Sequence, residues 1–201
     1  MQATQKKTIM PSQASLPGFE PAVPTDRLFL AAFPNAHDAA QLAAIANDYL
    51  ASHHLEAGAV ETSRLHVTLF HLGDYTDLPP ALVDSAGEAL SHLTAESLTI
   101  RFDQIGSFGN RQSKSPLVLA ASDGNERLHA LHKQLATHLR TSSLGQWTHG
   151  SYVPHMTVAY GKATMPLEKI EPITWAVNEV LLIHSLLGKT RHIRLASKAL
   201  L

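Results

Sequence analysis

Hydrophobic and polar residues recur along this chain in two periods, one typical of strands and one typical of helices. Short apolar runs bounded by Pro or Gly predict strands, and these lie at 27–33, 64–73, 97–108, 116–122 and 152–161. A hairpin formed by 175–187 and a strand that begins at 191 closes the chain. Apolar residues spaced three and four apart predict helices over 35 to about 58, over 80 to about 94, and after the capping residues 123–126.

Several neighbouring strands in this order are joined by connections too short for a parallel crossover. We therefore expect an α+β fold with antiparallel or mixed sheets and helices on one face. Gly106 is expected to mark a bulge or bend in its strand. Residues 1–24 mix Gln, Ser and Pro with few periodic apolar positions, so we expect a flexible arm there and one domain over 25–201.

Composition and charge exclude several classes of protein. The 201 residues include 16 Lys and Arg, 17 Asp and Glu, and 13 His. A net charge of -1 does not suit a protein that grips a nucleic-acid duplex through many phosphates. With no cysteine, the chain has no disulfide, thiolate nucleophile or zinc–thiolate site. The patterns of a secretory signal and of a membrane span are not visible, so we expect a cytoplasmic protein without a membrane partner. We also expect a monomer.

Two matching strands hold the histidines of greatest chemical interest. Residues 65–69 and 154–158 both read apolar-His-apolar-Thr-apolar. Because side chains alternate across a strand, each His shares a face with its Thr while the apolar residues point into the core. The bare tripeptide also occurs at His92, at a predicted helix end, and at His149, in a predicted loop, and we take both as accidental. The duplication in strand context is therefore the signal.

The polar residues of these motifs, His66, Thr68, His155 and Thr157, predict acid–base chemistry on an oxyanion. Imidazole has a pKa of about 6.5, so a pair of histidines can hold one neutral and one protonated ring near pH 7. Such a pair predicts a bell-shaped dependence of activity on pH. His71 stands five positions after His66, so a regular strand places it on the opposite face, and we expect it to be structural.

The segments RLHVTLFHLG and PHMTVAYG, and the order of elements between them, resemble the 2H phosphoesterase superfamily, and within it the bacterial 2'-5' RNA ligase or RNA 2',3'-cyclic phosphodiesterase family. The resemblance spans roughly residues 25–201. It implies two lobes, each an antiparallel sheet with outer helices, related by a pseudo-twofold axis. Each lobe contributes one His-x-Thr strand to a central cleft.

The resemblance also implies the reaction, which is hydrolysis of a 2',3'-cyclic phosphate or a 2'-5' phosphodiester without metal or cofactor, with 2'-5' ligation as its reverse. The expected partner is an RNA end or a small cyclic-phosphate nucleotide. One of His66 and His155 would take a proton from the attacking water and the other would protonate the leaving ribose oxygen. Thr68 and Thr157 would donate hydrogen bonds to the phosphoryl oxygens. The residues leave open which histidine is the base.

One position departs from the pattern of the resembling family. Many members carry Arg five positions after the second His, and this chain carries Tyr160. A tyrosine can stack on a base or form a hydrogen bond, but it brings no charge to a phosphate. The phosphate is then expected to rely on Arg111 or Lys114, in the basic loop 109–115, or on Arg191 near the last strand.

Two alternatives from other classes stay open. The remaining histidines, with Asp or Glu, could serve a metal-dependent phosphohydrolase, which chelators would inhibit. However, no two histidines have the spacing of the HExxH motif, so we expect no metal site. The second alternative is a non-catalytic module that binds RNA ends or nucleotides without turnover.

Overall fold

The structure is a computed structural model that describes residues 22–108 and 114–201. The strands of this part are β1 (Asp26–Ala32), β2 (Ala57–Ala59), β3 (Val67–Tyr75), β4 (Leu98–Ser107), β5 (Ser115–Ala120), β6 (His155–Gly161), β7 (Glu168–Val177), β8 (Glu179–Leu186) and β9 (Arg191–Ala199). Its α-helices are α1 (Ala36–Ser52), α2 (Pro80–Ser91) and α3 (Glu126–Thr141), and its short 3-10 helices are η1 (Thr62–Arg64) and η2 (Gly145–Trp147). None of the described helices is both long and apolar enough to cross a bilayer.

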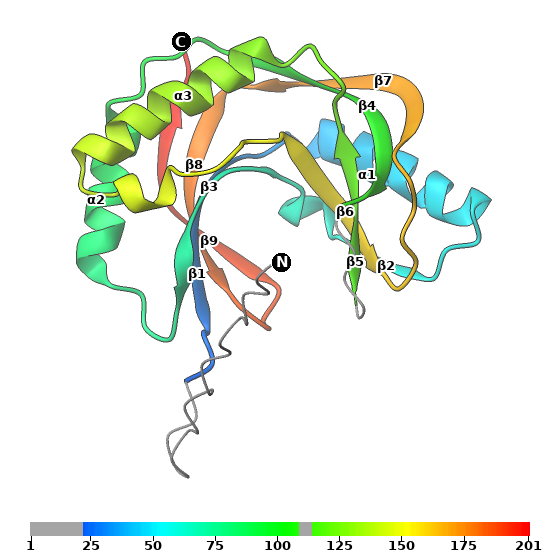
Figure 1. Cartoon of the computed structure of the whole chain (residues 1–201), viewed down its shortest axis with the longest axis horizontal. Coiled ribbons are helices and arrows are strands. Elements are labelled where there is room, and N and C mark those ends of the chain that lie inside the picture. Colours follow the sequence, from blue (N-terminus) through cyan, green and yellow to red (C-terminus); the bar gives the residue numbers. More distant parts are fainter. Residues whose placement is uncertain (1–21, 109–113) are drawn as a thin grey trace, which may run out of the picture.

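The strands form one antiparallel sheet in the order β7-β4-β5-β6-β3-β1-β8-β9, with β2 paired to β6. This sheet has two halves that meet where Val67 of β3 pairs with Met156 of β6. The two halves have the same topology. In each one, the two strands nearest the junction are connected through a helix, α1 between β1 and β3 and α3 between β5 and β6 (Figure 1). The predicted two-lobed α+β fold is confirmed, and its two sheets are the halves of this larger sheet.

The helices tie the two halves together. Helix α1 joins β1 to β3 but packs against β2 and β6 of the other half. Helix α3 joins β5 to β6, yet its His132 stacks on Phe70 of β3 with ring centroids 4.2 Å apart. Helix α2 packs against α3 and against β8 and β9, so α2 and α3 lie together at one end of the molecule and α1 lies at the other (Figure 1). Neither half can move far without breaking the helix packing of the other.

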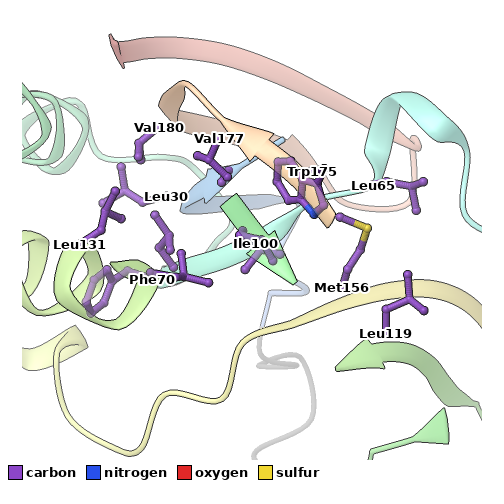
Figure 2. Packing of buried hydrophobic residues seen from close by; sticks show 14 of the residues in the cluster. Leu30, Leu65, Phe70, Ile100, Leu119, Leu131, Met156, Trp175, Val177 and Val180 are labelled. Carbon is purple, nitrogen blue, oxygen red and sulfur yellow. The ribbon is translucent and has the colours of Figure 1, made fainter. Parts of the chain in front are cut away.

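One hydrophobic core fills the space between the helices and the sheet. Figure 2 shows some of its buried members, among them Leu30 of β1, Leu131 of α3 and Met156 of β6. Burying a side chain of this size stabilises the fold by about 1.5–3 kcal/mol relative to leaving it exposed. The residues between the His and Thr of each motif, Val67 and Met156, are fully buried in this core. The core therefore fixes the strands that carry the motifs.

Several element boundaries differ from the sequence prediction, and two of the differences add a strand, β2 and β7. Helix α1 ends at Ser52 rather than near Gly58, because His54 adopts a left-handed φ of 52° that ends the helix. Residues 57–59 then form β2. The closing hairpin of β8 and β9 is confirmed, but the preceding apolar segment is divided at Asn178 between β7 and β8.

Gly106 is required by a close backbone contact. A Cβ at this position would lie 2.7 Å from Cα of Leu167 and closer still to the carbonyl oxygen of Pro166. We expect Gly106→Ala to lower the free energy of unfolding by about 1–3 kcal/mol, because the backbone must shift to relieve the overlap. Urea unfolding measures the change.

A matched control is Gly87→Ala in α2, where an added Cβ meets no atom within 4 Å. This substitution is expected to raise the free energy of unfolding by about 0.5–1 kcal/mol, because alanine favours the helix. A Gly106→Ala protein as stable as the original chain would contradict the contact with residues 166–167.

Candidate active site

The two His-x-Thr motifs meet at the centre of the sheet. Their middle residues are paired there, and in that antiparallel register His66 faces Thr157 while Thr68 faces His155. The two histidines thus occupy diagonal corners of a rectangle, about 7–8 Å apart by the usual spacing of such a pair. All four side chains are partly exposed, whereas the residues between them are buried. The predicted alternation therefore places them on one face, opposite the core.

These four side chains line one cavity of about 410 Å³. The remaining lining residues come from both halves of the sheet and from the segments next to it; they are Arg27, Phe29, Val60, Arg64, His71, Tyr160, Ser185, Leu187 and His192. The volume lies within the range of small-ligand sites, which is about 300–1,000 Å³.

Both histidines are held in the same tautomer. Nδ1 of His66 lies 2.6 Å from the carbonyl oxygen of Arg64, and Nδ1 of His155 lies 2.8 Å from that of Val153. In each case the carbonyl belongs to the residue two positions earlier. A carbonyl oxygen only accepts hydrogen bonds, so Nδ1 must carry the hydrogen. Nε2 is then a proton acceptor in the neutral ring and a donor in the protonated ring.

The surroundings of the two rings differ. His66 stacks against Phe29 and Phe33, with ring centroids 4.9 and 5.1 Å away, and meets the edge of His192 at 5.6 Å. His155 meets Phe108 edge-on at 5.2 Å. Burial lowers the pKa of His66, and the nearby charge of Arg64 lowers it further, against the hydrogen bond to the Arg64 carbonyl. The lowered pKa favours the neutral form of His66 near pH 7.

The structure corrects the expected position of His71. The register between β3 and β1 shifts at Leu69, and the register between β6 and β5 shifts at Val158. Each shift inserts one extra residue just after the Thr of the motif, and such a bulge reverses the face of the side chains that follow. His71 and Tyr160, each five positions after a motif histidine, therefore both line the cavity. The prediction that His71 lies on the opposite face is wrong because the strand is bulged.

A group of charged residues stands at one side of the cavity. Nε and Nη2 of Arg27 each donate to the Asp74 carboxylate at 2.7 Å, and Nε2 of His71 lies 2.8 Å from the same carboxylate. The hydrogen bond from Arg27 is the main reason that the pKa of Asp74 falls to about 2, and His71 contributes as well. The charge of Arg27 is therefore compensated by Asp74.

Of the cations expected from the sequence, the two that the structure describes do not line the cavity. Lys114 lines a second hollow, which shares Tyr160 with the cavity. Arg191 is exposed at the start of β9 and is not a lining residue of the cavity. Arg111 lies outside the described residues. In the part of the chain that the structure describes, no group of three or more His, Asp or Glu side chains is placed to hold a metal ion.

Two charged lining residues, Arg27 and Arg64, were not foreseen from the sequence, whereas His192 of the closing hairpin was a candidate either for the cleft or for the solvent-facing surface. Arg64 stands two positions before His66, and the alternation that joins His66 to Thr68 could have indicated it. Arg27 carries no such signal. Arg27 reaches the cavity because its strand β1 pairs with β3. His192 reaches it because its strand β9 pairs with β8, which in turn pairs with β1.

Comparisons with known proteins agree with this architecture. A model of the 2'-5' RNA ligase superfamily matches residues 33–189, which include both motifs. No curated protein sequence matches the chain. Among solved structures, Escherichia coli LigT in its apo form has a TM-score of 0.67 at 21% identity, covering 89% of this chain and 99% of LigT. LigT complexed with 3'-AMP has a TM-score of 0.65 at 21% identity, with the same coverage. TT0787 of Thermus thermophilus has a TM-score of 0.64 at 22% identity, covering 86% of this chain and 97% of that protein. These likenesses show a shared fold.

Proposed function

The chain belongs to the 2'-5' RNA ligase superfamily, and on that basis we propose that it is a phosphodiesterase that opens 2',3'-cyclic phosphates of RNA ends or nucleotides, or cleaves 2'-5' diesters, without a metal. The observation that carries this proposal is the pair of equivalent histidines at diagonal corners of one cavity. Each is fixed by the same backbone hydrogen bond and stands next to a threonine. Two such rings can supply a base on one side of a phosphorus atom and an acid on the other.

His66 is assigned as the base, because its lowered pKa favours the neutral ring near pH 7. Its Nε2 takes a proton from water while the water oxygen bonds to phosphorus. The bond from phosphorus to the 2' or 3' ribose oxygen breaks, and protonated His155 delivers the Nε2 proton to that oxygen. The diagonal placement suits an in-line displacement, in which the attacking and leaving oxygens lie on opposite sides of the phosphorus. Solvent then restores both protonation states.

Thr68 and Thr157 are assigned to the phosphoryl oxygens. Their hydroxyl groups occupy the other two corners of the same rectangle, so each can donate a hydrogen bond to a non-bridging oxygen between the histidines. Structures of E. coli LigT include a complex with 3'-AMP. That ligand is a ribose monophosphate, which is the class of product that opening of a cyclic phosphate releases.

The proposal is tested by incubating the purified protein with 2',3'-cyclic nucleotides and with a 2'-5'-linked dinucleotide, and by following the products by phosphorus NMR. We expect a monophosphate to appear, and the isomer tells which ribose oxygen leaves. Binding of these compounds without any product would contradict the proposal and would favour the non-catalytic module.

The pH dependence of kcat/KM follows from the protonation state of His66. Burial holds the pKa of this ring below the ordinary value of 6.5, and only the neutral ring can act as the base. Protonation therefore removes activity at a lower pH than for an exposed imidazole, so we expect the acid limb of the profile below pH 6.5. Initial rates across the range from acid to alkaline pH measure this limb.

A control for the cause of this shift is Phe33→Ala, which opens one aromatic side of His66 to water. Because desolvation is the largest cause of the lowered pKa, the acid limb of this variant is expected to move toward the ordinary value. A limb at pH 7 or above in the original chain would contradict His66 as the base.

A further inference from the structure

We propose that Arg64 binds the phosphodiester anion in the cavity, a role that rests on the proposed function. Tyr160 brings no charge to this anion, and Lys114 and Arg191 do not line the cavity. Its guanidinium lines the same cavity as the four residues of the two motifs. It would bind the diester while His66 and His155 transfer protons.

The backbone of Arg64 is locked to the base. Arg64 is the last residue of η1, and its N–H donates to the carbonyl oxygen of Glu61 at 2.8 Å. Its own carbonyl oxygen accepts the Nδ1 hydrogen of His66 at 2.6 Å. The next residue, Leu65, is buried in the core. The backbone of Arg64 and the imidazole of His66 therefore keep a fixed relation, so the arginine side chain starts from a fixed point beside the base.

The guanidinium of Arg64 has an unmet hydrogen-bonding capacity. Its Nε is buried and has no hydrogen-bond partner, and within residues 22–108 and 114–201 its side chain forms no ion pair. A buried donor without a partner destabilises the fold unless a ligand or water completes it. Arg27, the other arginine of the cavity, already has both its Nε and Nη2 on Asp74. Of the two described arginines that line the cavity, Arg64 is therefore the one that is available to an anion.

The electrostatics of the cavity point to the same anion. Burial is the main cause of the lowered pKa of both His66 and His192, and the charge of Arg64 lowers each further. Arg64 thus makes this part of the cavity unfavourable for a second positive charge. With Arg27 compensated by Asp74, the described residues that line the cavity leave one permanent positive charge, that of Arg64, which matches the single negative charge of a phosphodiester.

The experiment compares the original chain with Arg64→Met, which keeps an unbranched apolar stem but removes the charge, and with Arg64→Lys, which keeps the charge. Calorimetry measures the affinity for inorganic phosphate, and initial rates give kcat/KM for a 2',3'-cyclic nucleotide. We expect Arg64→Met to weaken phosphate binding about ten-fold or more and to lower kcat/KM about 10²-fold. We expect Arg64→Lys to recover part of both losses, because its ammonium replaces the charge but not the planar fork of donors.

Two observations decide between this role and its alternatives. Arg127→Met removes an exposed arginine that pairs with Glu96 on the surface, and it is expected to leave both values unchanged. Loss of Arg64 should also move the acid limb of the pH profile upward, since its charge no longer opposes protonation of His66. If Arg64→Met does not fold, as judged by circular dichroism, Arg64→Gln serves as the neutral variant.

The assignment of Arg64 is overturned if a folded neutral variant binds phosphate as tightly as the original chain, or if the loss is confined to Arg191→Met or Lys114→Met. Failure of the proposed function looks different. The original chain would then bind phosphate in an Arg64-dependent manner but would release no product from any cyclic or 2'-5' diester.

Discussion

Replacement of either His66 or His155 by Ala is expected to lower kcat/KM for a 2',3'-cyclic nucleotide by about 10²–10⁴-fold, because each variant lacks one of the two proton transfers. The double variant should be little worse than either single one, since a base without its acid, or an acid without its base, leaves the concerted step incomplete. Initial rates at pH 7 measure the three variants, and circular dichroism verifies their fold.

The control for these variants is His37→Ala. His37 is exposed in the first turn of α1 and contacts Gln41 of the same helix, so its loss should leave the rate unchanged. A His66→Ala or His155→Ala protein that is folded and keeps most of its activity would contradict the assignment of that residue.

Thr68→Val and Thr157→Val are expected to produce the second largest effect, a fall in kcat of about 10²–10³-fold for each. Valine has the shape of threonine and favours strands equally, so the substitution removes the hydroxyl donor and little else. The loss should appear mainly in kcat, because a donor aimed at the charge that develops on the phosphoryl oxygens stabilises the transition state more than the bound substrate. Steady-state kinetics separate kcat from KM.

Thr174→Val is the matched control, because Thr174 is an exposed strand residue of β7. It should change neither parameter. If Thr68→Val and Thr157→Val instead raised KM and left kcat unchanged, the hydroxyls would bind the ground state, and their proposed role in the transition state would be wrong.

The arrangement of the motifs was predictable because strand alternation is a local property. A buried residue between each His and Thr, confirmed for Val67 and Met156, forces the polar side chains onto the other face. The resemblance to the 2H phosphoesterases, which these motifs carry, implied two equivalent lobes. The pattern could not predict that these two buried residues pair directly, because strand order depends on contacts between segments far apart in the chain.

The bulges after the two motifs show where the local rule fails. Counting by twos from His66 assigns His71 to the wrong face, and the same count from His155 would misplace Tyr160. One extra residue in each strand, Leu69 and Val158, restores both side chains to the cavity. Both residues after each Thr are apolar and buried, so the sequence carries no polar signal at the bulge. The equivalence of the two strands supports a built feature rather than a local irregularity.

The charged groups of the cavity were the least predictable part of the site. Basic residues in a polar loop and at a strand start suggested Arg111, Lys114 and Arg191, since such positions are often free to bind phosphate. Among the described residues, the arginines that line the cavity are Arg27 and Arg64, and neither Lys114 nor Arg191 does so. An arginine becomes available to a ligand through the absence of a carboxylate partner as much as through its position. Whether a carboxylate is present depends on tertiary structure. Here Arg27 pairs with Asp74, whereas Arg64 has no ion pair among the described residues.

The two histidines alone are proposed to supply the acid and the base that break the phosphodiester. The most direct measurement is the rate at which the original chain hydrolyses a 2',3'-cyclic nucleotide in excess EDTA, compared with the rate after a divalent metal ion is added back. A two-histidine mechanism without metal predicts the same rate, within about two-fold, under both conditions, with a ribose monophosphate as the product. A protein that is inactive in EDTA and regains activity with the metal would contradict it and would establish metal-assisted hydrolysis instead.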